Sequence, residues 1–508
     1  MSRWRIHISW PPGPGWIALT TAALIGIELG ARGFATNDEA RFPLLAQDIL
    51  ARGDWLWPRL NGAAYHNKPP LLAWLIAVLS WPEGHVSELT AVLPSAMSVI
   101  AVVWLTFMVA RDLSGSEAGS YAALFAMTMQ GLFFSAHLAL PDPLMMTFVT
   151  ASVWMLARMA QEPTESWWIG FYGCAGAAFW AKGLSGLLPI AVGIGYWIAT
   201  RSSRRWTLRL VPGSLLVSAI VMVWVVLGTV DGSRGLAQAV MTDQITWYRP
   251  VGFKLGSLTA PLGNMSVVLI PWTLVVPLAL AAAMVACRRS HWKRSIRLTV
   301  VWLVVTIVLV AVSREQRLRY YAPVVPPAAI LLGWWISSWL GQWLSGARVR
   351  PVVLHRPAAW LWCSLPLAWA CAVVGFAIGY HVELGFHQRA AEYGALAERI
   401  RPFLAENPVV AVWELPELPL AFYLDRPVVR LERESDLRKL VEESAGVIVV
   451  ASETGWARRC SDAKAMSDRE RLEPRQVILI HRPPKVAYRL SRWRVFRRIL
   501  HRSARDYS

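Results

Sequence analysis

Long apolar stretches without a charged residue are the feature that most limits how this chain can fold. Two of them, "TAVLPSAMSVIAVVWLTFMVA" (90–110) and "LVPGSLLVSAIVMVWVVLGTV" (210–230), are about as long as a helix that crosses a bilayer, roughly 20 residues. Only 17% of the residues are charged, whereas soluble domains average about 25%. The 29 tryptophans suit the headgroup layer, which favours amphipathic rings. We therefore predict a polytopic α-helical membrane protein.

The apolar runs predict eleven membrane-spanning helices. The first run has no small-residue cleavage site, so we expect a retained signal anchor instead of a cleaved signal peptide. The segment "LLAWLIAVLSW" (71–81) is too short to span and is expected to form a juxtamembrane helix. The predicted spans are 14–31, 90–110, 118–138, 143–160, 166–181, 184–200, 210–230, 265–286, 296–312, 323–344 and 359–380.

Basic residues between the spans indicate how the chain is oriented. Loops with almost no acidic residues carry Arg111, Arg158 and the basic segments 201–209, 287–297 and 346–356. The charge rule places these loops and the N-terminus in the cytoplasm. The net charge of +18 then indicates contact with anionic lipids, and no nucleic acid is expected as a partner. The five cysteines have no paired or metal-type spacing, so no disulfide framework is expected.

Residues 381–508 have a different character. Four segments read as short buried strands, "NPVVAVWEL", "RPVVRL", "AGVIVVAS" and "RQVILIHR", and "ESDLRKLVEES" reads as a helix between them. We therefore expect a catalytic membrane domain, 1–380, whose first periplasmic loop is 32–89, and a soluble periplasmic α/β domain, 381–508. The basic tail of the second domain would by itself favour the cytoplasm. It lies more than a hundred residues past the last span, where the charge rule has little force.

An acidic pair, Asp38 and Glu39, follows the first span. One interpretation is structural: Asn37 would cap a helix, acids in the first turn would favour the helix dipole, and Gly53 would end the helix. An amphipathic helix lying on the membrane would explain the pair without catalysis. The other interpretation places Asp38 in a catalytic site at the membrane surface.

Three further positions combine charge with a constrained backbone. Lys68 precedes two prolines and follows Tyr65. This setting would hold the lysine amine in place for a specific anion. The alternative is an ordinary interfacial lysine, which would contact headgroups nonspecifically. Asp142 lies between two prolines in a turn predicted between spans, where it would either bond the local backbone or bind substrate. Lys182 lies at a junction of two spans among small residues.

The segment "SREQRLRYYAPVVPP" (313–327) carries Arg317, Arg319 and Tyr320 on the outer side, where the charge rule disfavours basic residues. Guanidinium groups and tyrosine hydroxyls together suit a phosphate. The acids and bases predicted on one face of the bilayer therefore match an enzyme that acts on a lipid phosphate. No glycine-rich loop supports a nucleotide donor, and no His, Cys or carboxylate set has strong metal-ligand spacing.

The order of these clusters resembles that of the membrane glycosyltransferases that use polyprenyl-phosphate sugars. The likeness is to the lipid A aminoarabinose transferases and the related bacterial members of the protein O-mannosyltransferase superfamily. It covers roughly the first 330 residues, and its most specific part is "DEAR" some 30 residues ahead of "KPPL". The matching stretches are "NDEARFPLLAQDILARGDWLWPRLNG", "YHNKPPLLAWL", "LPDPLMMTF", "AKGLSGLLP" and "RLRYYAPVVPPAAILL".

The resemblance implies a GT-C fold with its active site on the periplasmic face. It implies that Asp38 is the principal catalytic carboxylate, with Glu39 beside it, and that Asp142 completes the acidic side. Many relatives carry an acid, at which a divalent cation can bind, where this chain has Asn67. A divalent cation is therefore the one cofactor considered, and no metal ligand is assigned. The expected donor-phosphate ligands are Lys68, Arg317, Arg319 and Tyr320 by analogy, and Lys182 and Tyr65 from their own sequence settings.

We expect an inverting sugar transfer from an undecaprenyl-phosphate donor to lipid A or another acceptor, on the periplasmic face of a bacterial inner membrane. One alternative is transfer to Ser or Thr of a protein, as in O-mannosylation. A different class, a lipid or solute transporter, would carry charges near the bilayer midplane. The apolar runs lack such charges apart from Glu28 and His137, which lie near span ends. A non-catalytic scaffold would leave the outer charges dispensable.

Overall fold

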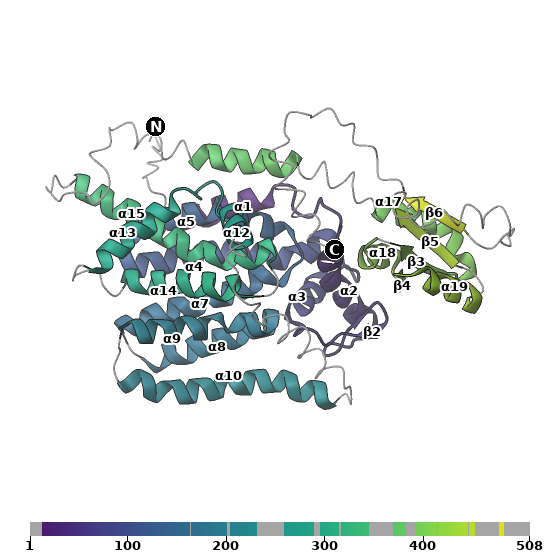
Figure 1. The fold of residues 1–508 in the computed structure, drawn as a ribbon, viewed down its shortest axis with the longest axis horizontal. Helices are drawn as coiled ribbons and strands as arrows, with labels where there is room; N and C mark the ends of the chain where they lie inside the picture. The colour runs from purple at the N-terminus through teal and green to yellow at the C-terminus, as the bar shows by residue number, and fades with distance from the viewer. Residues whose placement is uncertain are drawn as a thin grey trace, which may run out of the picture. The chain divides into compact units, whose positions relative to one another are not determined.

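The chain is mostly helical and divides into two compact units (Figure 1). Unit 1 consists of residues 1–29, 66–72 and 92–380, and unit 2 consists of residues 30–65, 73–91 and 381–508. The computed structural model describes residues 13–162, 164–200, 204–230, 259–288, 295–313, 316–344, 369–382, 393–413, 415–444, 447–452 and 477–481.

Unit 1 is built mainly of apolar helices. In the described part of the chain, three helical runs are long and apolar enough to cross a membrane: α4 (Glu88–Ser114), α7 (Pro141–Gln161) and the run Glu165–Thr200. Within that third run, η2 (Gly183–Leu187) joins α8 (Glu165–Lys182) to α9 (Leu188–Thr200). The other elements are α1 (Pro14–Gly26), α5 (Ser116–Met127), α6 (Gln130–Phe133), η1 (Phe134–His137), α10 (Arg204–Val230), α12 (Thr259–Val268), α13 (Val276–Arg288), α14 (Ser295–Ala311), η5 (Leu318–Val324), α15 (Val325–Leu344) and a helix over Trp369–Val382.

Two of the predicted spans are broken well inside their bounds. The span predicted at 118–138 breaks after Met127, and the Gln130 N–H there donates to the carbonyl of Ile270 (3.0 Å). The span predicted at 265–286 is divided between α12 and α13. The residues that lie outside the described part of the chain include the N-terminus before residue 13, the basic segment 346–356, the start of the span predicted at 359–380 and the basic tail.

Helix α7 begins at Pro141, whose fixed φ suits the first position of a helix. The Ser95 hydroxyl of α4 donates to the Leu140 carbonyl (3.1 Å), and the Thr147 hydroxyl of α7 donates to the Ser98 carbonyl (3.0 Å). The two helices therefore run parallel. With 21 residues at about 1.5 Å each, α7 is about 30 Å long, which matches the hydrocarbon thickness of a bilayer.

A charged cluster joins the C-terminal ends of α4 and α7. The Asp112 carboxylate accepts hydrogen bonds from Arg111 (2.8 Å) and from the indole of Trp154 (2.9 Å). Arg158 lies 3.7 Å from the same carboxylate, and only 6% of the Asp112 side chain is exposed. Because α7 starts at its other end with Asp142, which is paired with Lys182, ion pairs mark both ends of this helix.

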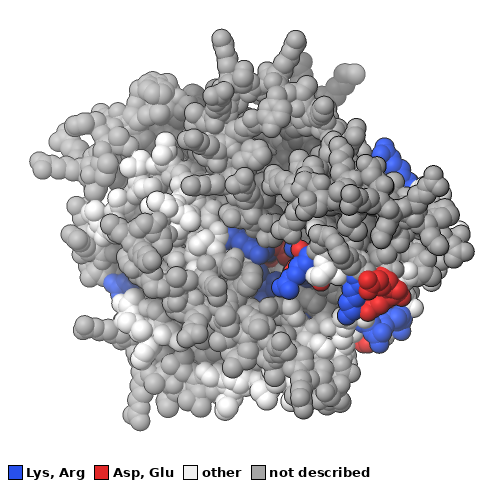
Figure 2. Space-filling model, turned by 45° about the vertical axis from the view of Figure 1, so that its right-hand side comes forward, with Lys and Arg blue, Asp and Glu red and all other residues white. Residues whose placement is uncertain are grey.

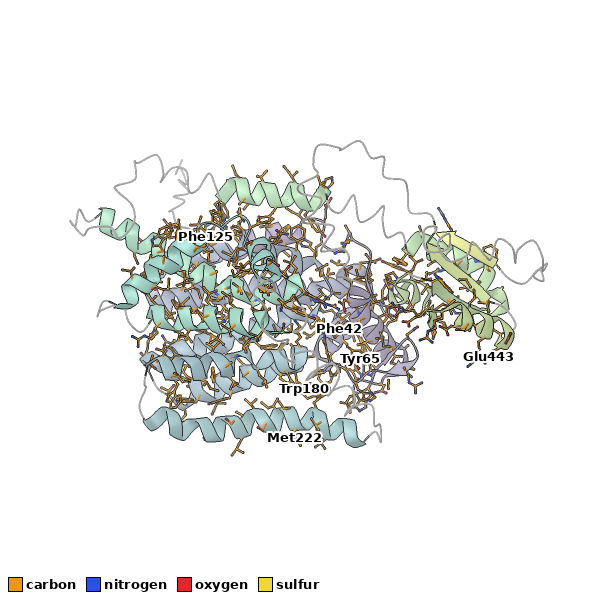
Figure 3. All side chains as sticks on the ribbon, in the orientation of Figure 1. Phe42, Tyr65, Phe125, Trp180, Met222 and Glu443 are labelled. Atoms are coloured by element: carbon orange, nitrogen blue, oxygen red, sulfur yellow. The ribbon has the colours of Figure 1, made fainter. Side chains whose placement is uncertain are left out.

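Helix α10 packs against α8 and carries apolar side chains on its outer surface. The Met222 side chain projects away from the neighbouring helices and is 51% exposed (Figure 3). Leu215 and Val226 are also exposed. A helix surface of this kind matches contact with lipid tails.

Unit 2 begins with the segment that carries Asp38. Helix α2 (Asn37–Arg52) ends at Gly53, whose φ of +74° and N–H bond to Ile49 confirm the predicted stop signal. The apolar residues Phe42 and Leu45 face inward, as the predicted amphipathic pattern requires. A short hairpin, β1 (Arg59–Leu60) with β2 (Ala63–Ala64), and α3 (Leu71–Ser80) follow.

The described part of the C-terminal segment folds around a parallel sheet in the order β4-β3-β5-β6. Helices α17 and α18 pack on one face of it and α19 on the other, which covers both faces as a parallel sheet requires. The strands and α19 coincide with the segments predicted from the sequence. Placement of this segment in a soluble periplasmic domain, with a boundary at residue 380, stays a prediction. The elements are α17 (Tyr393–Ile400), η6 (Arg401–Glu406), β3 (Val409–Trp413), α18 (Glu417–Leu424), β4 (Val428–Leu431), α19 (Glu434–Glu443), β5 (Val447–Ser452) and β6 (Val477–His481).

Candidate active site

A buried ion pair joins the start of α7 to the end of α8. The Lys182 ammonium donates to the Asp142 carboxylate, and these residues are only 6% and 1% exposed. The Ser152 hydroxyl of α7 donates to the Phe171 carbonyl of α8 (2.8 Å), so the helices run antiparallel and these two ends meet. Gly183, with a φ of +78°, ends α8 directly after the lysine.

Asp142 lies in the first turn of a helix, whereas the sequence predicted it in a turn between spans. Pro141 occupies the first helical position, so Asp142 falls in the first turn of α7, where backbone N–H groups and the helix dipole favour a negative charge. Lys182 lies in the last turn of α8, where a positive charge is favoured. Both helix ends therefore support the charge that the ion pair places there.

Tyr320 and Arg319 extend this pair into a cationic group. They lie on η5, which packs against α7, α12, α14 and α15. The Tyr320 ring centre is 4.6 Å from the Lys182 nitrogen and 5.5 Å from the guanidinium carbon of Arg319. Cation–π contacts of this kind contribute about 0.5–2 kcal/mol.

Positive charges from three separate parts of unit 1 act on the Asp142 carboxylate. They come from Lys182, from Arg319 and from Lys68, which precedes α3. Arg319 lies on η5, and Arg317 directly precedes it; the donor contact expected of Arg317 stays a prediction. We call Lys68, Asp142, Lys182, Arg319 and Tyr320 the cationic cluster. In the space-filling view, basic side chains gather in a recess near the middle of the face shown, with acidic atoms beside them (Figure 2).

The predicted site residues of unit 2 are Asp38, Glu39 and Tyr65. Asp38 lies in the first turn of α2, where its carboxylate is 2.9 Å from Arg41 and its side chain is 12% exposed. Tyr65 is buried, as is Phe42 of α2 (Figure 3). The catalytic role expected of Asp38 and the donor contact expected of Tyr65 stay predictions.

Glu39 has structural partners for both carboxylate oxygens. One oxygen accepts from Arg32 (3.0 Å), and the other accepts from the N–H of Ala35 (3.1 Å). The Thr36 hydroxyl accepts from the N–H of Glu39 (3.3 Å). Thr36 therefore caps α2, and the prediction that Asn37 is the cap was wrong. These contacts favour a structural role for Glu39, and its predicted catalytic role stays untested.

Sequence reasoning missed Glu417 and Tyr423 of α18. Both bond residues just before Asp38, namely Asn37 and Phe34, across separations of 380 and 389 residues. No local pattern reports contacts at such separations. The only available signal was a tyrosine in the otherwise apolar stretch "LPLAFYL", where a buried hydroxyl usually has a hydrogen-bond partner.

No group of three or more His, Cys, Asp or Glu side chains that could hold a metal ion occurs among the residues that the structure describes. Asn67, next to Lys68, contributes a neutral amide and not a carboxylate. The divalent cation considered from the sequence stays a prediction.

Comparisons with known proteins point to one group of enzymes. Residues 67–228 match the family described as dolichyl-phosphate-mannose-protein mannosyltransferase. The undecaprenyl phosphate-alpha-4-amino-4-deoxy-L-arabinose arabinosyl transferase of Pectobacterium carotovorum is 24% identical over 72% of this chain and 65% of its own length. The chain spans less than two thirds of the curated relatives that it matches first.

Solved structures show the same fold. The crystal structure of ArnT from Cupriavidus metallidurans in the apo state superposes with a TM-score of 0.68 over 88% of this chain and 94% of that chain, at 21% identity. The same protein bound to undecaprenyl phosphate gives 0.65 over 84% and 88%, also at 21% identity. An oligosaccharyltransferase from Archaeoglobus fulgidus gives 0.56 over 85% and 68%, at 10% identity. The chain has the fold of these structures, and the resemblance to transferases that use polyprenyl-phosphate sugars, predicted from the sequence, is confirmed.

Proposed function

We propose that this chain is an integral membrane glycosyltransferase that moves a sugar from an undecaprenyl-phosphate donor to lipid A or another acceptor, with inversion. The observation that carries the proposal is the cationic cluster: Lys182 is bonded to a buried carboxylate, Asp142, and positive charges from two other parts of unit 1, Arg319 and Lys68, act on the same group. A departing phosphate is the chemistry that such a cluster stabilises. The solved relative that binds undecaprenyl phosphate supports this choice of donor.

The proposed reaction forms one bond and breaks another at the anomeric carbon. The acceptor oxygen attacks this carbon, the bond to the phosphate oxygen breaks, and undecaprenyl phosphate leaves with the electron pair. Lys68, Lys182 and Arg319 stabilise the charge that grows on the phosphate. If the acceptor is a hydroxyl, Asp38 takes its proton as general base. If the acceptor is a phosphate, as on lipid A, no base is needed and Asp38 positions the substrate.

We assign the cationic cluster to the periplasmic face of a bacterial inner membrane. Arg111 and Arg158 lie at the end of the α4–α7 pair opposite Asp142, and the positive-inside rule puts such arginines in the cytoplasm. The N-terminus is then cytoplasmic, and the C-terminal α/β segment is a soluble periplasmic domain. A lipid-linked donor suits this face, because the charge of a nucleotide sugar does not cross a bilayer.

A second candidate is transfer to Ser or Thr of a protein. The description of the matching family favours it, because that family is named for protein mannosylation. Such a reaction needs a general base for the hydroxyl, which gives Asp38 a necessary role. The same donor and the same cationic cluster would serve both reactions.

Mass spectrometry of lipid A and of periplasmic glycoproteins, with and without the gene, tests the proposal. We expect lipid A to lose one sugar-sized mass when the gene is deleted and to regain it when the gene is restored. Loss of a hexose from a periplasmic protein would instead select the protein acceptor. Identical lipid A and identical glycoproteins in both strains, under conditions in which the chain is expressed, would contradict the proposal.

A further inference from the structure

The segment that carries Asp38 is held at two points by one short helix of the C-terminal segment. All residues concerned belong to unit 2. Residues 33–37 run along α18, and hydrogen bonds fix them at both ends of that helix. Nothing in the proposed chemistry requires these contacts to exist, so they call for their own explanation.

At the first point, the Asn37 side chain bonds the N-terminal end of α18. Its amide nitrogen donates to the Glu417 carboxylate (2.9 Å), and its carbonyl oxygen accepts from the backbone N–H of Leu418 (3.0 Å). Helix α18 has Pro416 before its first residue and no side-chain cap of its own. Asn37 therefore satisfies an N–H group that the helix leaves without an intrahelical partner.

At the second point, the Tyr423 hydroxyl bonds two groups near the C-terminal end of α18. It accepts from the N–H of Phe34 (3.1 Å) and donates to the Glu88 carboxylate (2.8 Å). Burial and the nearby Glu88 charge raise the pKa of Tyr423 well above its usual range, so the hydroxyl keeps the proton that it donates. A side chain at Gly33 would begin 2.9 Å from this hydroxyl oxygen, so a larger residue there would displace the Tyr423 hydroxyl.

We infer that Asn37 and Tyr423 are positioning residues for Asp38. Asp38 follows Asn37 directly, and the two residues between Phe34 and the helix, Ala35 and Thr36, leave little freedom once both ends are fixed. Through these contacts α18 sets where the first turn of α2, and with it the Asp38 carboxylate, lies. This inference rests on the proposed function, because it assigns the contacts to the placement of a reacting group.

A matched control lies in the same unit. The Asn61 side chain bonds both the N–H and the carbonyl of Val428 on β4 (2.7 Å each), so it is also an asparagine that anchors the first loop to the C-terminal segment. It lies 23 residues beyond Asp38 in the sequence. Removing Asn61 should therefore loosen the loop without moving the carboxylate.

The test compares kcat and KM for release of undecaprenyl phosphate by the reconstituted full chain. We expect Asn37→Ala and Tyr423→Phe to lower kcat by about 10- to 100-fold with little change in KM, since small displacements of a reacting group cost this much. Asn61→Ala should leave kcat unchanged.

The double exchange Asn37→Asp with Glu417→Gln swaps donor and acceptor and should restore much of the kcat lost in Asn37→Ala. Equal kcat for Asn37→Ala and Asn61→Ala, or no recovery in the double exchange, would overturn the inference.

Hydrogen exchange separates this inference from the proposed function, because it needs no turnover. In Asn37→Ala we expect faster exchange of backbone amides at residues 34–40, whereas Asn61→Ala should affect 59–64 and leave 34–40 unchanged. Unchanged exchange at 34–40 in Asn37→Ala would overturn the inference whatever the activity. A wild-type chain that releases no undecaprenyl phosphate would overturn the proposed function and, with it, the role given to the contacts.

Discussion

Replacing Lys182 with alanine is expected to lower the free energy of unfolding by about 3–5 kcal/mol and to abolish sugar transfer. The loss of stability follows because the Asp142 carboxylate, 1% exposed, would remain buried without its hydrogen-bonded cation. The loss of transfer follows because the cluster would lose the cation that Tyr320 also contacts. Thermal unfolding in detergent and a transfer assay on the folded fraction measure the two effects separately.

Two variants separate the structural role of this pair from its chemical role. Exchanging the partners, Asp142→Lys with Lys182→Asp, should recover part of the lost stability without recovering transfer, because the positive charge moves to the other helix. Asp112→Asn breaks the partly exposed charged cluster that joins α4 and α7 at the opposite end of α7. It should lower stability and leave the turnover of the folded fraction unchanged. A Lys182→Ala chain with normal stability and normal transfer would contradict the account of the pair.

With a hydroxyl acceptor, Asp38→Asn is expected to lower turnover by about 10²- to 10⁴-fold, the contribution typical of a general base, while the chain stays folded. The substitution keeps the size of the side chain, and the Arg41 contact that it weakens (2.9 Å) is partly exposed, so the stability cost should be below about 1 kcal/mol. Rates measured over a range of pH would show whether an ionising group with a carboxyl pKa disappears in the variant.

The purely structural interpretation of Asp38 makes a different prediction. An acid that only complements the dipole of α2 contributes about 0.3–1 kcal/mol of stability and nothing to turnover. Asp48→Asn supplies the control on the same helix, because Asp48 is paired with Arg52 and also bonds the N–H of Arg59 (2.7 Å). Equal turnover in the Asp38 and Asp48 variants would remove Asp38 from the chemistry.

The amino-acid pattern predicts the local elements of this chain well. Gly53 ends α2 because a left-handed residue is needed there, and Lys182 lies at a helix junction because Gly183 stops α8. The strands of the C-terminal segment follow from short runs of β-branched residues, of which β5 (Val447–Ser452) is an example. Each of these features is decided by neighbours in the sequence.

Features decided by distant residues were predicted poorly. Asparagine is a common residue at helix N-caps, but Thr36 caps α2. The Asn37 amide is bonded to Glu417 and Leu418 instead. The break in the span predicted at 118–138 depends on Ile270, far along the chain. Hydrophobicity alone continues through such a break, since it does not report which carbonyl a backbone N–H will find.

The ion pair of Asp142 and Lys182 lies between these cases. The sequence marked both residues as candidates on the outer side, and the structure joins them through the antiparallel packing of α7 and α8. Their partnership with Tyr320 depends on η5, which comes 136 residues after α8 ends. A charge pattern can predict that residues share a face of the membrane, but contact between them requires the packing of the helices.

Release of undecaprenyl phosphate by the purified full chain would show whether it is a glycosyltransferase with this donor. The chain would be reconstituted in nanodiscs with lipid A and a panel of undecaprenyl-phosphate sugars, and both lipid products would be followed by mass spectrometry. We expect one donor to yield undecaprenyl phosphate and sugar-modified lipid A in equal amounts. If the acceptor is a protein, a peptide supplied in place of lipid A should be modified instead. Lys68→Ala should reduce both products together. A folded wild-type chain that releases no undecaprenyl phosphate from any donor in the panel, with either acceptor, would contradict this account.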